Sequence, residues 1–270
     1  MPGSNLVAIG DRVASGDKVA IIGHRGARNL WPENSLDGFR RTRALGIEGV
    51  EFDVHPSRDG VLVVIHDPML ERTTEGQGFV ADKTAAELAA TKLRDGGGEG
   101  IPTFDEVLDV FAGSAIELHI EIKTDANGKL YRGLEQRLVD VIAQRNLQDT
   151  AILTCFAPKA LEIVREIAPH QRVLASVNQR SADAMGGVAA ALDRFTAIDG
   201  CMVAVEKGLL ADNLDYCLER LGRERLGAWV PNEPEDIAAW LARPVRQITT
   251  DRPDLALEQR RILTRSLHSD

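Results

Sequence analysis

The chain has 270 residues, of which 44% are hydrophobic and 27% are charged, so it can bury one substantial core. No apolar stretch approaches the roughly 20 residues that a membrane helix needs, and we expect no transmembrane segment. The formal net charge of -9 disfavours nonspecific binding to nucleic acid, whose phosphates attract clustered positive charge, and an anionic substrate would need local positive groups or a metal.

The two ends of the chain and its cysteines bear on domain limits and compartment. Residues 1–18 place Asp, Arg and Gly between short apolar pieces and lack the long apolar region of a secretory signal. We expect an N-terminal extension over residues 1–18, a single domain over 19–263 and a frayed C-terminal tail over 264–270. The three cysteines are odd in number and show no CxxC spacing, which argues against a disulfide framework and a zinc site. A cytoplasmic location is therefore expected.

Apolar runs of β type alternate with amphipathic stretches along the chain, which is the sequence form of repeated βα units. The strand candidates are residues 19–23, 49–54, 61–65, 116–123, 151–156, 172–177, 201–205, 226–230 and 247–251. They number nine, and a (β/α)8 barrel has eight strand places. We therefore expect either 172–177 or 201–205 to be an extra strand or part of a loop.

Helical periodicity is clearest in the first half of the chain. Residues 35–45, 83–93 and 103–111 are expected to be helices, and Asn34 or Ser35 can cap the first of them. No linker-like shift in composition and no repeat of fixed period appears. The pattern favours one continuous α/β domain.

Ionisable residues lie on two of the expected strands. Glu51 and Asp53 are two residues apart, so on a regular strand both side chains point to the same face. Glu121 and Lys123 have the same spacing, with His119 one step earlier on that face. Exposed carboxylates on an edge strand and an ordinary salt bridge are the alternatives, but the three carboxylates also indicate one divalent metal site. Oxygen ligands suit Mg²⁺ or Ca²⁺, and the sequence does not choose between them.

Two histidines each follow an apolar strand. Imidazoles titrate near neutrality, so His24 and His66 together indicate acid and base catalysis, whereas either alone is as readily a structural residue. Arg25 offers forked donors that match phosphate oxygens, and an ion pair with Glu33 is its structural alternative. Asp67 is expected to orient a loop or to cap the turn that follows.

Short motifs along the chain carry a family resemblance. They are, in order, HRG at 24–26, PENS at 32–35, EFDV at 51–54, RDG at 58–60, HD at 66–67, RTTEGQG at 72–78, IPTFDEVL at 101–108, EIK at 121–123 and TDRP at 250–253. With them the chain resembles the glycerophosphodiester phosphodiesterase family from residue 20 to about 255. The resemblance implies a single-domain TIM-type (β/α)8 barrel with its site at the carboxyl ends of the strands. It also implies roles: Glu51, Asp53 and Glu121 as metal ligands, His24 and His66 as acid and base, and Arg25 and Lys123 as phosphate-binding groups.

Three segments depart from the family pattern. Asn34-Ser35 stands where the family often has Asn-Thr, which keeps a hydroxyl. Cys155 stands where a hydroxyl would face the substrate, and Phe156 follows it. Trp229 keeps the aromatic residue of a late Trp-Thr-Val-Asn pattern, to which this chain adds a proline. The residues expected to line the pocket or to support it are Glu33, Asn34, Cys155, Phe156 and Trp229.

The resemblance implies metal-dependent hydrolysis of glycerophosphodiesters to glycerol 3-phosphate and an alcohol. The glycerol 2-hydroxyl would attack phosphorus with the help of the two histidines, and water would then open the resulting cyclic phosphate. Two alternatives stay open: a lysophospholipase D-like phosphodiesterase that acts on lipid diesters, and a catalytically silent binding barrel. A small-molecule substrate and no nucleic acid partner are expected. The preferred headgroup and the oligomeric state are left open.

Overall fold

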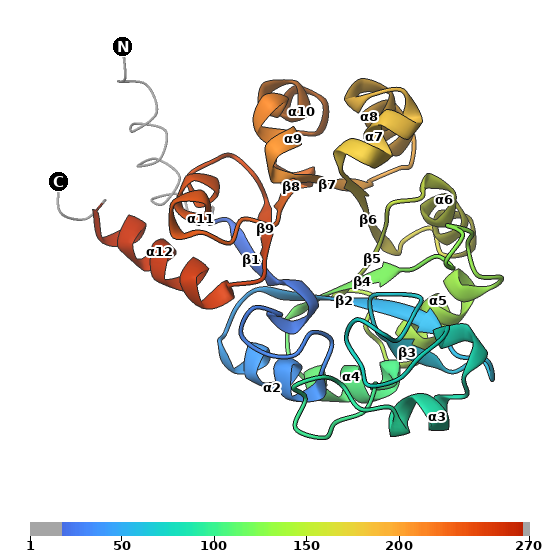
Figure 1. The fold of residues 1–270 in the computed structure, drawn as a ribbon. Helices are drawn as coiled ribbons and strands as arrows, with labels where there is room; N and C mark the ends of the chain where they lie inside the picture. Colours follow the sequence, from blue (N-terminus) through green and yellow to red (C-terminus); the bar gives the residue numbers. More distant parts are fainter. Residues whose placement is uncertain (1–17, 267–270) are drawn as a thin grey trace, which may run out of the picture.

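Eight parallel strands close into a barrel in the computed structural model, which describes residues 18–266 (Figure 1). The barrel strands are β1 (Ala20–Gly23), β2 (Gly49–Pro56), β4 (Glu117–Ile122), β5 (Ala151–Cys155), β6 (Arg172–Val177), β7 (Met202–Glu206), β8 (Leu226–Trp229) and β9 (Gln247–Thr250). The ring closes because β1 pairs in parallel with both β9 and β2. The predicted single-domain barrel is confirmed.

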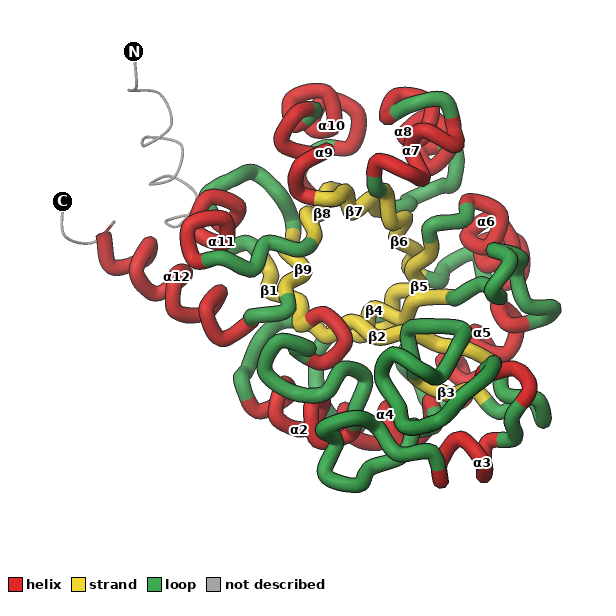
Figure 2. The backbone as a smooth tube through the Cα atoms, viewed as in Figure 1, coloured by secondary structure: helices red, strands yellow, loops and turns green. Residues whose placement is uncertain are grey.

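Helices surround the ring on its outer side (Figure 2). They are α2 (Leu36–Ala44), α3 (Ala85–Ala90), α4 (Phe104–Phe111), α5 (Leu134–Gln144), α6 (Pro158–Ile167), α7 (Gln179–Met185), α8 (Val188–Thr196), α9 (Lys207–Asp212), α10 (Leu214–Leu221), α11 (Pro234–Leu241) and α12 (Pro253–Ser266), with short 3-10 turns η1 (His24–Gly26), η2 (Val80–Asp82) and η3 (Arg223–Arg225). The three helices predicted in the first half are present as α2, α3 and α4. Ser35 caps α2, because its hydroxyl accepts the N–H of Gly38 at 3.0 Å.

The predicted limits of the domain fall close to the ends of the described chain. Helix α12 runs to Ser266, so the first three residues of the expected C-terminal tail are helical. Residues 267–270, and residues 1–17 of the expected N-terminal extension, lie outside the described residues.

The extra strand is β3 (Leu62–Val64), which lies outside the ring and pairs with β2 in the antiparallel sense (Figure 1). The expectation that residues 172–177 or 201–205 would be the extra strand is wrong, because β6 and β7 both belong to the ring. A short turn containing Gly60, whose φ is 84°, joins β2 to β3. Such a turn can join antiparallel strands only, since parallel neighbours need a longer crossover.

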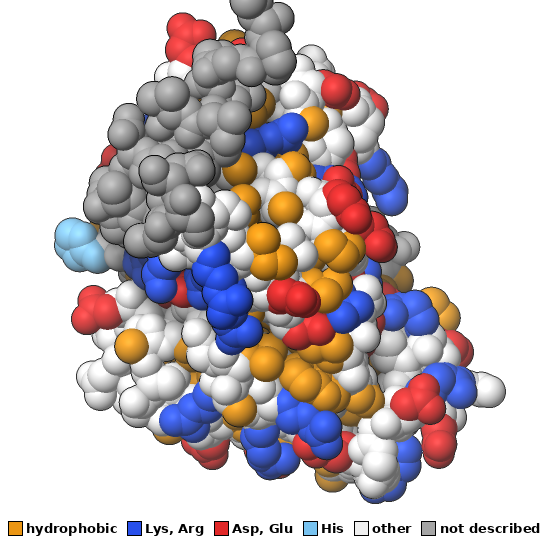
Figure 3. Space-filling model, turned by 90° about the vertical axis from the view of Figure 1, so that its left-hand side faces the viewer, with side chains coloured by type: hydrophobic (Ala, Val, Ile, Leu, Met, Phe, Trp, Pro, Cys, Tyr) orange, Lys and Arg blue, Asp and Glu red, His pale blue; other side chains and the backbone are white. Residues whose placement is uncertain are grey.

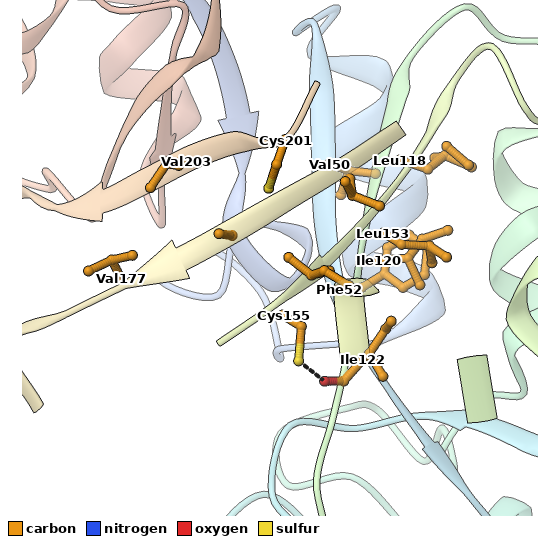
Figure 4. Close-up of a cluster of buried hydrophobic side chains, with 14 of the residues drawn as sticks. Val50, Phe52, Leu118, Ile120, Ile122, Leu153, Cys155, Val177, Cys201 and Val203 are labelled. Atoms are coloured by element: carbon orange, nitrogen blue, oxygen red, sulfur yellow. Dashed lines mark hydrogen bonds between the residues drawn. The ribbon is translucent and has the colours of Figure 1, made fainter. Parts of the chain in front are cut away.

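Alternation of side chains along the barrel strands separates the core from the interior of the ring. On β2, Val50, Phe52 and Val54 point outward and are fully buried against the helices, and the apolar residues of β4 do the same (Figure 4). Glu51 and Asp53 therefore point inward. A slip of one residue would move both carboxylates into the core and forfeit roughly 1.5–3 kcal/mol for each apolar side chain exposed. Burial of the apolar side chains on the outer face of β2 thus fixes Glu51 and Asp53 on its inner face.

The described part of the chain contains no helix that combines the length and the apolar character needed to cross a membrane. On the face turned to the viewer in Figure 3, acidic and basic side chains are interspersed around a central group of hydrophobic ones. Neither sign of charge gathers into an extended patch on that face.

Candidate active site

A cavity of about 290 Å³ opens at the carboxyl ends of the barrel strands. Its polar side is contributed by the chain around β1, β2, β3 and β4 and includes His24, Arg25, Glu51, His66, His119 and Glu121. The opposite side is more apolar and includes Phe156, Leu174, Ala204 and Trp229. The fold therefore brings both predicted catalytic histidines to one cavity of a size suited to a small molecule.

Glu51, Asp53 and Glu121 form an acidic cluster, in which one carboxylate oxygen of each residue lies within 4.8 Å of the others. Burial raises the pKa of Glu51 well above its ordinary value, and the charges of Asp53 and Glu121 add to this rise. Glu51 Oε1 and Asp53 Oδ1 are buried and accept no hydrogen bond from any described residue. Buried anionic oxygens without partners are costly. This set of hard oxygen atoms fits a divalent cation of the Mg²⁺ or Ca²⁺ type.

Two cations flank the acidic cluster. Lys123 Nζ lies 2.8 Å from Glu121 Oε1 and 3.3 Å from Asp53 Oδ1, the second contact being an ion pair without hydrogen-bond geometry. Arg25 Nε lies 3.6 Å from Asp53 Oδ2. Burial alone would raise the pKa of Asp53, but the charges of Lys123 and Arg25 hold it well below its ordinary value. The neighbouring carboxylates likewise outweigh burial and raise the pKa of Lys123, so both cations keep their charge at neutral pH.

His24 is oriented by a carboxylate. Its Nδ1 donates to Asp251 Oδ1 at 2.5 Å, so Nε2 is left toward the cavity, where it lies 3.8 Å from Glu51 Oε2. Asp251 is fully buried, contacts Arg28 Nε at 2.9 Å and accepts a hydrogen bond from Asn232 Nδ2 at 2.8 Å. Burial lowers the pKa of His24, and the bond to Asp251 offsets only part of the effect. The tautomer of His24 is thereby fixed with the proton on Nδ1.

The turn that carries His24 needs unusual backbone angles. Arg25 has a φ of 50° and Gly26 a φ of 71°. A Cβ at position 26 would lie 2.9 Å from the ring of Phe39, so glycine alone fits there. The N–H of Arg25 donates to Glu51 Oε2 at 3.0 Å, which ties the turn to the acidic cluster. Backbone strain of this kind persists where several contacts define the conformation.

His66 follows β3, outside the ring, yet lines the same cavity. Its Nδ1 donates to Asp67 Oδ1 at 2.5 Å, so Asp67 orients the imidazole itself rather than a loop or turn alone. Arg72 connects Asp67 to Glu33, with contacts of 2.5 and 2.7 Å. Burial alone would raise the pKa of Asp67, but hydrogen bonds from Arg72 and His66 outweigh it and lower this pKa to about 2. The backbone carbonyl of His66 accepts the Nε2–H of the buried His55 at 3.1 Å.

Glu33 supports Arg25, which lines the cavity, and Asn34 supports Asp53 in the acidic cluster. Asn34 adopts a φ of 56°, and its Nδ2 donates to Asp53 Oδ2 at 2.9 Å. Glu33 accepts from Arg25 Nη1 at 3.3 Å as well as from Arg72. The ion pair weighed as an alternative for Arg25 is therefore present, and it holds the guanidinium beside the acidic cluster.

Phe156 and Trp229 form part of the apolar side of the cavity, with their rings edge to face and 5.7 Å between centroids. Cys155 does not line this cavity. It points into the core, where its Sγ donates to the carbonyl oxygen of Ile122 at 3.3 Å (Figure 4). Thr154 lines the cavity instead, because neighbouring residues of a strand face opposite ways. The cavity wall therefore keeps a hydroxyl.

Asp251, the partner of His24, is the main residue that sequence reasoning missed. It lies in the TDRP segment, directly after the buried strand β9. A carboxylate at the end of a buried strand is the signal that singled out Asp53, so Asp251 could have been found in the same way. Ser176 and Thr249 also line the cavity, but small polar residues on strands carry no comparable signal.

The fold and the site define a single-domain (β/α)8 barrel whose cavity is lined by two oriented histidines, Arg25 and two carboxylates of the acidic cluster, with Asp53 and Lys123 directly beside it. Residues 24–255 match the sequence profile of the Glycerophosphoryl diester phosphodiesterase family, and the chain belongs to that family. The resemblance seen in the motifs is confirmed.

Relatives and solved structures agree with this assignment. The glycerophosphodiester phosphodiesterase of Caldanaerobacter subterraneus subsp. tengcongensis is 38% identical over 164 residues, which cover 58% of this chain and 65% of that protein. The chain spans less than two thirds of this and other curated relatives that it matches. A solved structure from Agrobacterium tumefaciens has a TM-score of 0.80 at 25% identity and covers 94% of this chain and 100% of that one. The structure of an Oleispira antarctica phosphodiesterase with its product sn-glycerol-3-phosphate has a TM-score of 0.75 at 22% identity, covers 92% and 99% of the two chains, and shows likeness of fold alone.

Proposed function

We propose that the protein hydrolyses glycerophosphodiesters to glycerol 3-phosphate and an alcohol. The observation that carries the proposal is the pair of imidazoles in one cavity, each with its Nδ1 bonded to a carboxylate and its Nε2 left for a substrate. An acidic cluster and two cations lie in or beside the same cavity. Membership of the family supports the same reaction.

Arg25 and Lys123 would bind the phosphodiester anion. Both are held beside the acidic cluster by ion pairs, and both carry their charge at neutral pH. Arg25 can offer two parallel donors, whereas Lys123 supplies a compact charge. Glu51, Asp53 and Glu121 would hold one divalent cation, which supplies positive charge that stabilises the phosphate anion and favours ionisation of a nearby hydroxyl.

The two histidines would move the protons. One Nε2 accepts the proton of the glycerol 2-hydroxyl as that oxygen forms a bond to phosphorus, and the other Nε2 gives a proton to the departing alcohol oxygen. The products of this step are a cyclic glycerol phosphate and the free alcohol. With the roles exchanged, water adds to phosphorus, the ring bond to the 2-oxygen breaks, and glycerol 3-phosphate results. Which histidine acts first as the base is left open.

The cavity favours small, water-soluble diesters over lysophospholipids. Its volume of about 290 Å³ is at the lower end of the range for small-molecule sites, which leaves little room for an acyl chain inside the ring. A silent binding barrel is disfavoured by the two carboxylate-oriented histidines, because binding alone needs neither of them.

A coupled assay of glycerol 3-phosphate release tests the activity. Glycerophosphocholine should be cleaved, chelation with EDTA should abolish cleavage, and added Mg²⁺ or Ca²⁺ should restore it. Full activity after thorough demetallation would remove the cation from the proposal. Release of choline from lysophosphatidylcholine at a higher kcat/KM than from glycerophosphocholine would favour the lysophospholipase D-like alternative.

The cyclic route has its own test. An analogue of glycerophosphocholine without the 2-hydroxyl should bind with similar affinity but turn over far more slowly, because its phosphate contacts remain and its nucleophile is missing. Bis(p-nitrophenyl) phosphate should also be a poor substrate despite its better leaving group. Phosphorus NMR early in the reaction should show a cyclic phosphate. Comparable turnover of the deoxy analogue with no cyclic species would point to direct attack by water.

A cytoplasmic location is part of the proposal. It is supported by Cys155, Cys201 and Cys217, which are all buried and free. Burial raises the pKa of Cys155 and of Cys201 to about 12, so neither thiol is reactive at neutral pH.

A further inference from the structure

A second hollow, of about 510 Å³, lies beside the catalytic cavity, and Glu121, Phe156 and Asn178 line both. We call this hollow the side groove. Its remaining walls come from the end of β4 and the segment after it (residues 122–128), from Cys155 and Ala157 around the end of β5, and from Arg180, Ser181 and Ala184 of α7. The shared residues show that the groove adjoins the catalytic cavity on the side of β4, β5 and β6.

The side groove begins where the phosphate is proposed to bind. Lys123 lines the groove, and its Nζ lies against Glu121 and Asp53 at the acidic cluster. A phosphodiester carries two alcohol arms on one phosphorus. If the glycerol arm occupies the catalytic cavity, the second arm needs an adjoining space next to Lys123, and the side groove is such a space.

The groove offers hydrogen-bond donors that lack partners. Arg180 is exposed and lines the groove, and its guanidinium makes no ion pair or hydrogen bond with any of residues 18–266. The Oδ1 of Asn178 accepts the N–H of Ser181 at 2.8 Å, so its Nδ2 is the atom left for a ligand. Together with the ammonium of Lys123, which is paired with Glu121 and Asp53, these groups line the groove with positive charge and N–H donors.

Carboxylates near the groove are engaged elsewhere. Asp125 Oδ1 accepts the N–H groups of Asn127 and Lys129 at 2.8 and 2.9 Å, and Asp183 Oδ1 accepts from Gln179 Nε2 at 2.7 Å. Neither acidic residue lines the groove. Glu121, which does line it, is paired with Lys123. The groove therefore favours an anion over a cation.

We propose that the side groove binds the leaving alcohol of the diester and that Arg180 selects alcohols that carry an anionic group such as a carboxylate or phosphate. The inference rests on the proposed phosphodiesterase activity. A quaternary ammonium headgroup would need a carboxylate or a cage of aromatic rings. Among residues 18–266, Phe156 is the one aromatic residue that lines the groove, so these residues offer choline no such cage.

Glycerophosphoserine and glycerophosphoethanolamine provide a matched test, because their headgroups differ by one carboxylate. The wild type should prefer the serine diester in kcat/KM. Arg180→Gln should reduce the ratio of the two kcat/KM values by about three- to fivefold, as expected for one partly exposed ion pair. Arg261→Gln is the control: it removes the same charge from an exposed position on α12, away from the groove, and should leave the ratio unchanged.

Ala184→Trp tests the groove independently of charge. Ala184 is exposed on α7 and lines the groove, so a large ring there narrows the space without entering the core. The variant should raise KM for both diesters, while inhibition by glycerol 3-phosphate, which occupies the catalytic cavity alone, should keep its constant.

The outcomes separate the two levels of the argument. Cleavage of both diesters with the same ratio in wild type and Arg180→Gln would overturn the groove inference and leave the activity standing. Unchanged KM values in a folded Ala184→Trp protein would do the same. If neither diester releases glycerol 3-phosphate, the proposed function fails, and the groove inference fails with it.

Discussion

Asp251→Asn is the substitution that most directly tests the role of the oriented histidine. In the wild type, His24 Nδ1 and Asn232 Nδ2 donate to this carboxylate at 2.5 and 2.8 Å, and Arg28 Nε forms an ion pair with it at 2.9 Å without hydrogen-bond geometry. An amide offers one acceptor oxygen and one NH2 group in place of two acceptor oxygens. Whichever way the amide turns, at least one donor faces another donor inside a fully buried site.

The size of the effect follows from these contacts. Asn232 Oδ1 accepts the backbone N–H of residue 251 at 2.9 Å, which keeps the NH2 group of Asn232 directed at the side chain of residue 251. The new amide at position 251 should therefore turn its oxygen toward that NH2 group. The amide NH2 then faces His24 Nδ1, which loses its proton to Nε2. An imidazole in the wrong tautomer should lower kcat on the order of 10²- to 10⁴-fold. The KM should change little, because Arg25 and Lys123 do not contact residue 251.

Steady-state kinetics on glycerophosphocholine, together with nitrogen NMR of the imidazole tautomers, measures both parts of this prediction. Asp254→Asn is a matched control, since it makes the same change three residues away, where the carboxylate pairs with Arg252 on the surface of α12. The control should keep kcat within about twofold. A kcat for Asp251→Asn close to that of the control, or a proton that stays on Nδ1 of His24, would refute the reasoning.

Three further changes have defined outcomes. Glu51→Gln should abolish the rise in Tm caused by Mg²⁺ or Ca²⁺ yet leave the metal-free protein at least as stable, because burial raises the pKa of this carboxyl group and disfavours its charged form; differential scanning calorimetry with and without the ion decides. His66→Ala should lower kcat about 10²- to 10⁴-fold with an unchanged circular dichroism spectrum, and near-normal turnover would exclude it from proton transfer. Burial lowers the pKa of His55 to about 4 from 6.5, so unfolding, which frees it to take a proton, becomes easier as the pH falls below about 6.5. Urea titrations from about pH 8 to about pH 5 should show wild type losing about 2 kcal/mol more than His55→Gln, and equal losses would contradict this account.

Much of the site could be read from the sequence because of one rule. A charged residue on a strand that is buried on both faces costs free energy unless a partner or a ligand compensates its charge. Glu51, Asp53 and Glu121 are therefore conspicuous among their apolar neighbours. Their joint position was implied by parallel strands, whose carboxyl ends meet at one end of a barrel. The spacing of Glu121 and Lys123 allowed a salt bridge between them, which is present. The sequence could not show that Arg25 would lie against Asp53, since that depends on side-chain conformation.

The position of the extra strand, β3, could have been predicted from the length of the connection that precedes it. Only five residues separate Pro56 from Leu62, and a parallel crossover needs a dozen or more. Residues 61–65 therefore could not be the next strand of the ring, whatever their composition. The length of the connection constrains the strand order more strongly than the apolar content of these residues does.

The strand period would also have placed Cys155 correctly. Thr154 and Phe156 flank it, and residues two apart on a strand share a face. If Phe156 lines the cavity, Thr154 does so too and Cys155 points to the core, as observed. The hydroxyl at the cavity wall therefore belongs to Thr154, one residue before the position at which the motif comparison places it.

The two imidazoles rest on supports of unequal strength. His24 directly follows β1 of the ring and is anchored by Asp251, a carboxylate with no exposed surface. His66 belongs to the segment outside the ring, and Arg72, which holds its partner Asp67, has a side chain that is 45% exposed. Exposed ion pairs weaken with ionic strength, since salt screens charges over about 8 Å under physiological conditions. The segment outside the ring can open locally while the barrel stays closed. If His66 transfers a proton as proposed, heat or salt should accordingly lower the proposed activity by displacing His66 before the barrel unfolds.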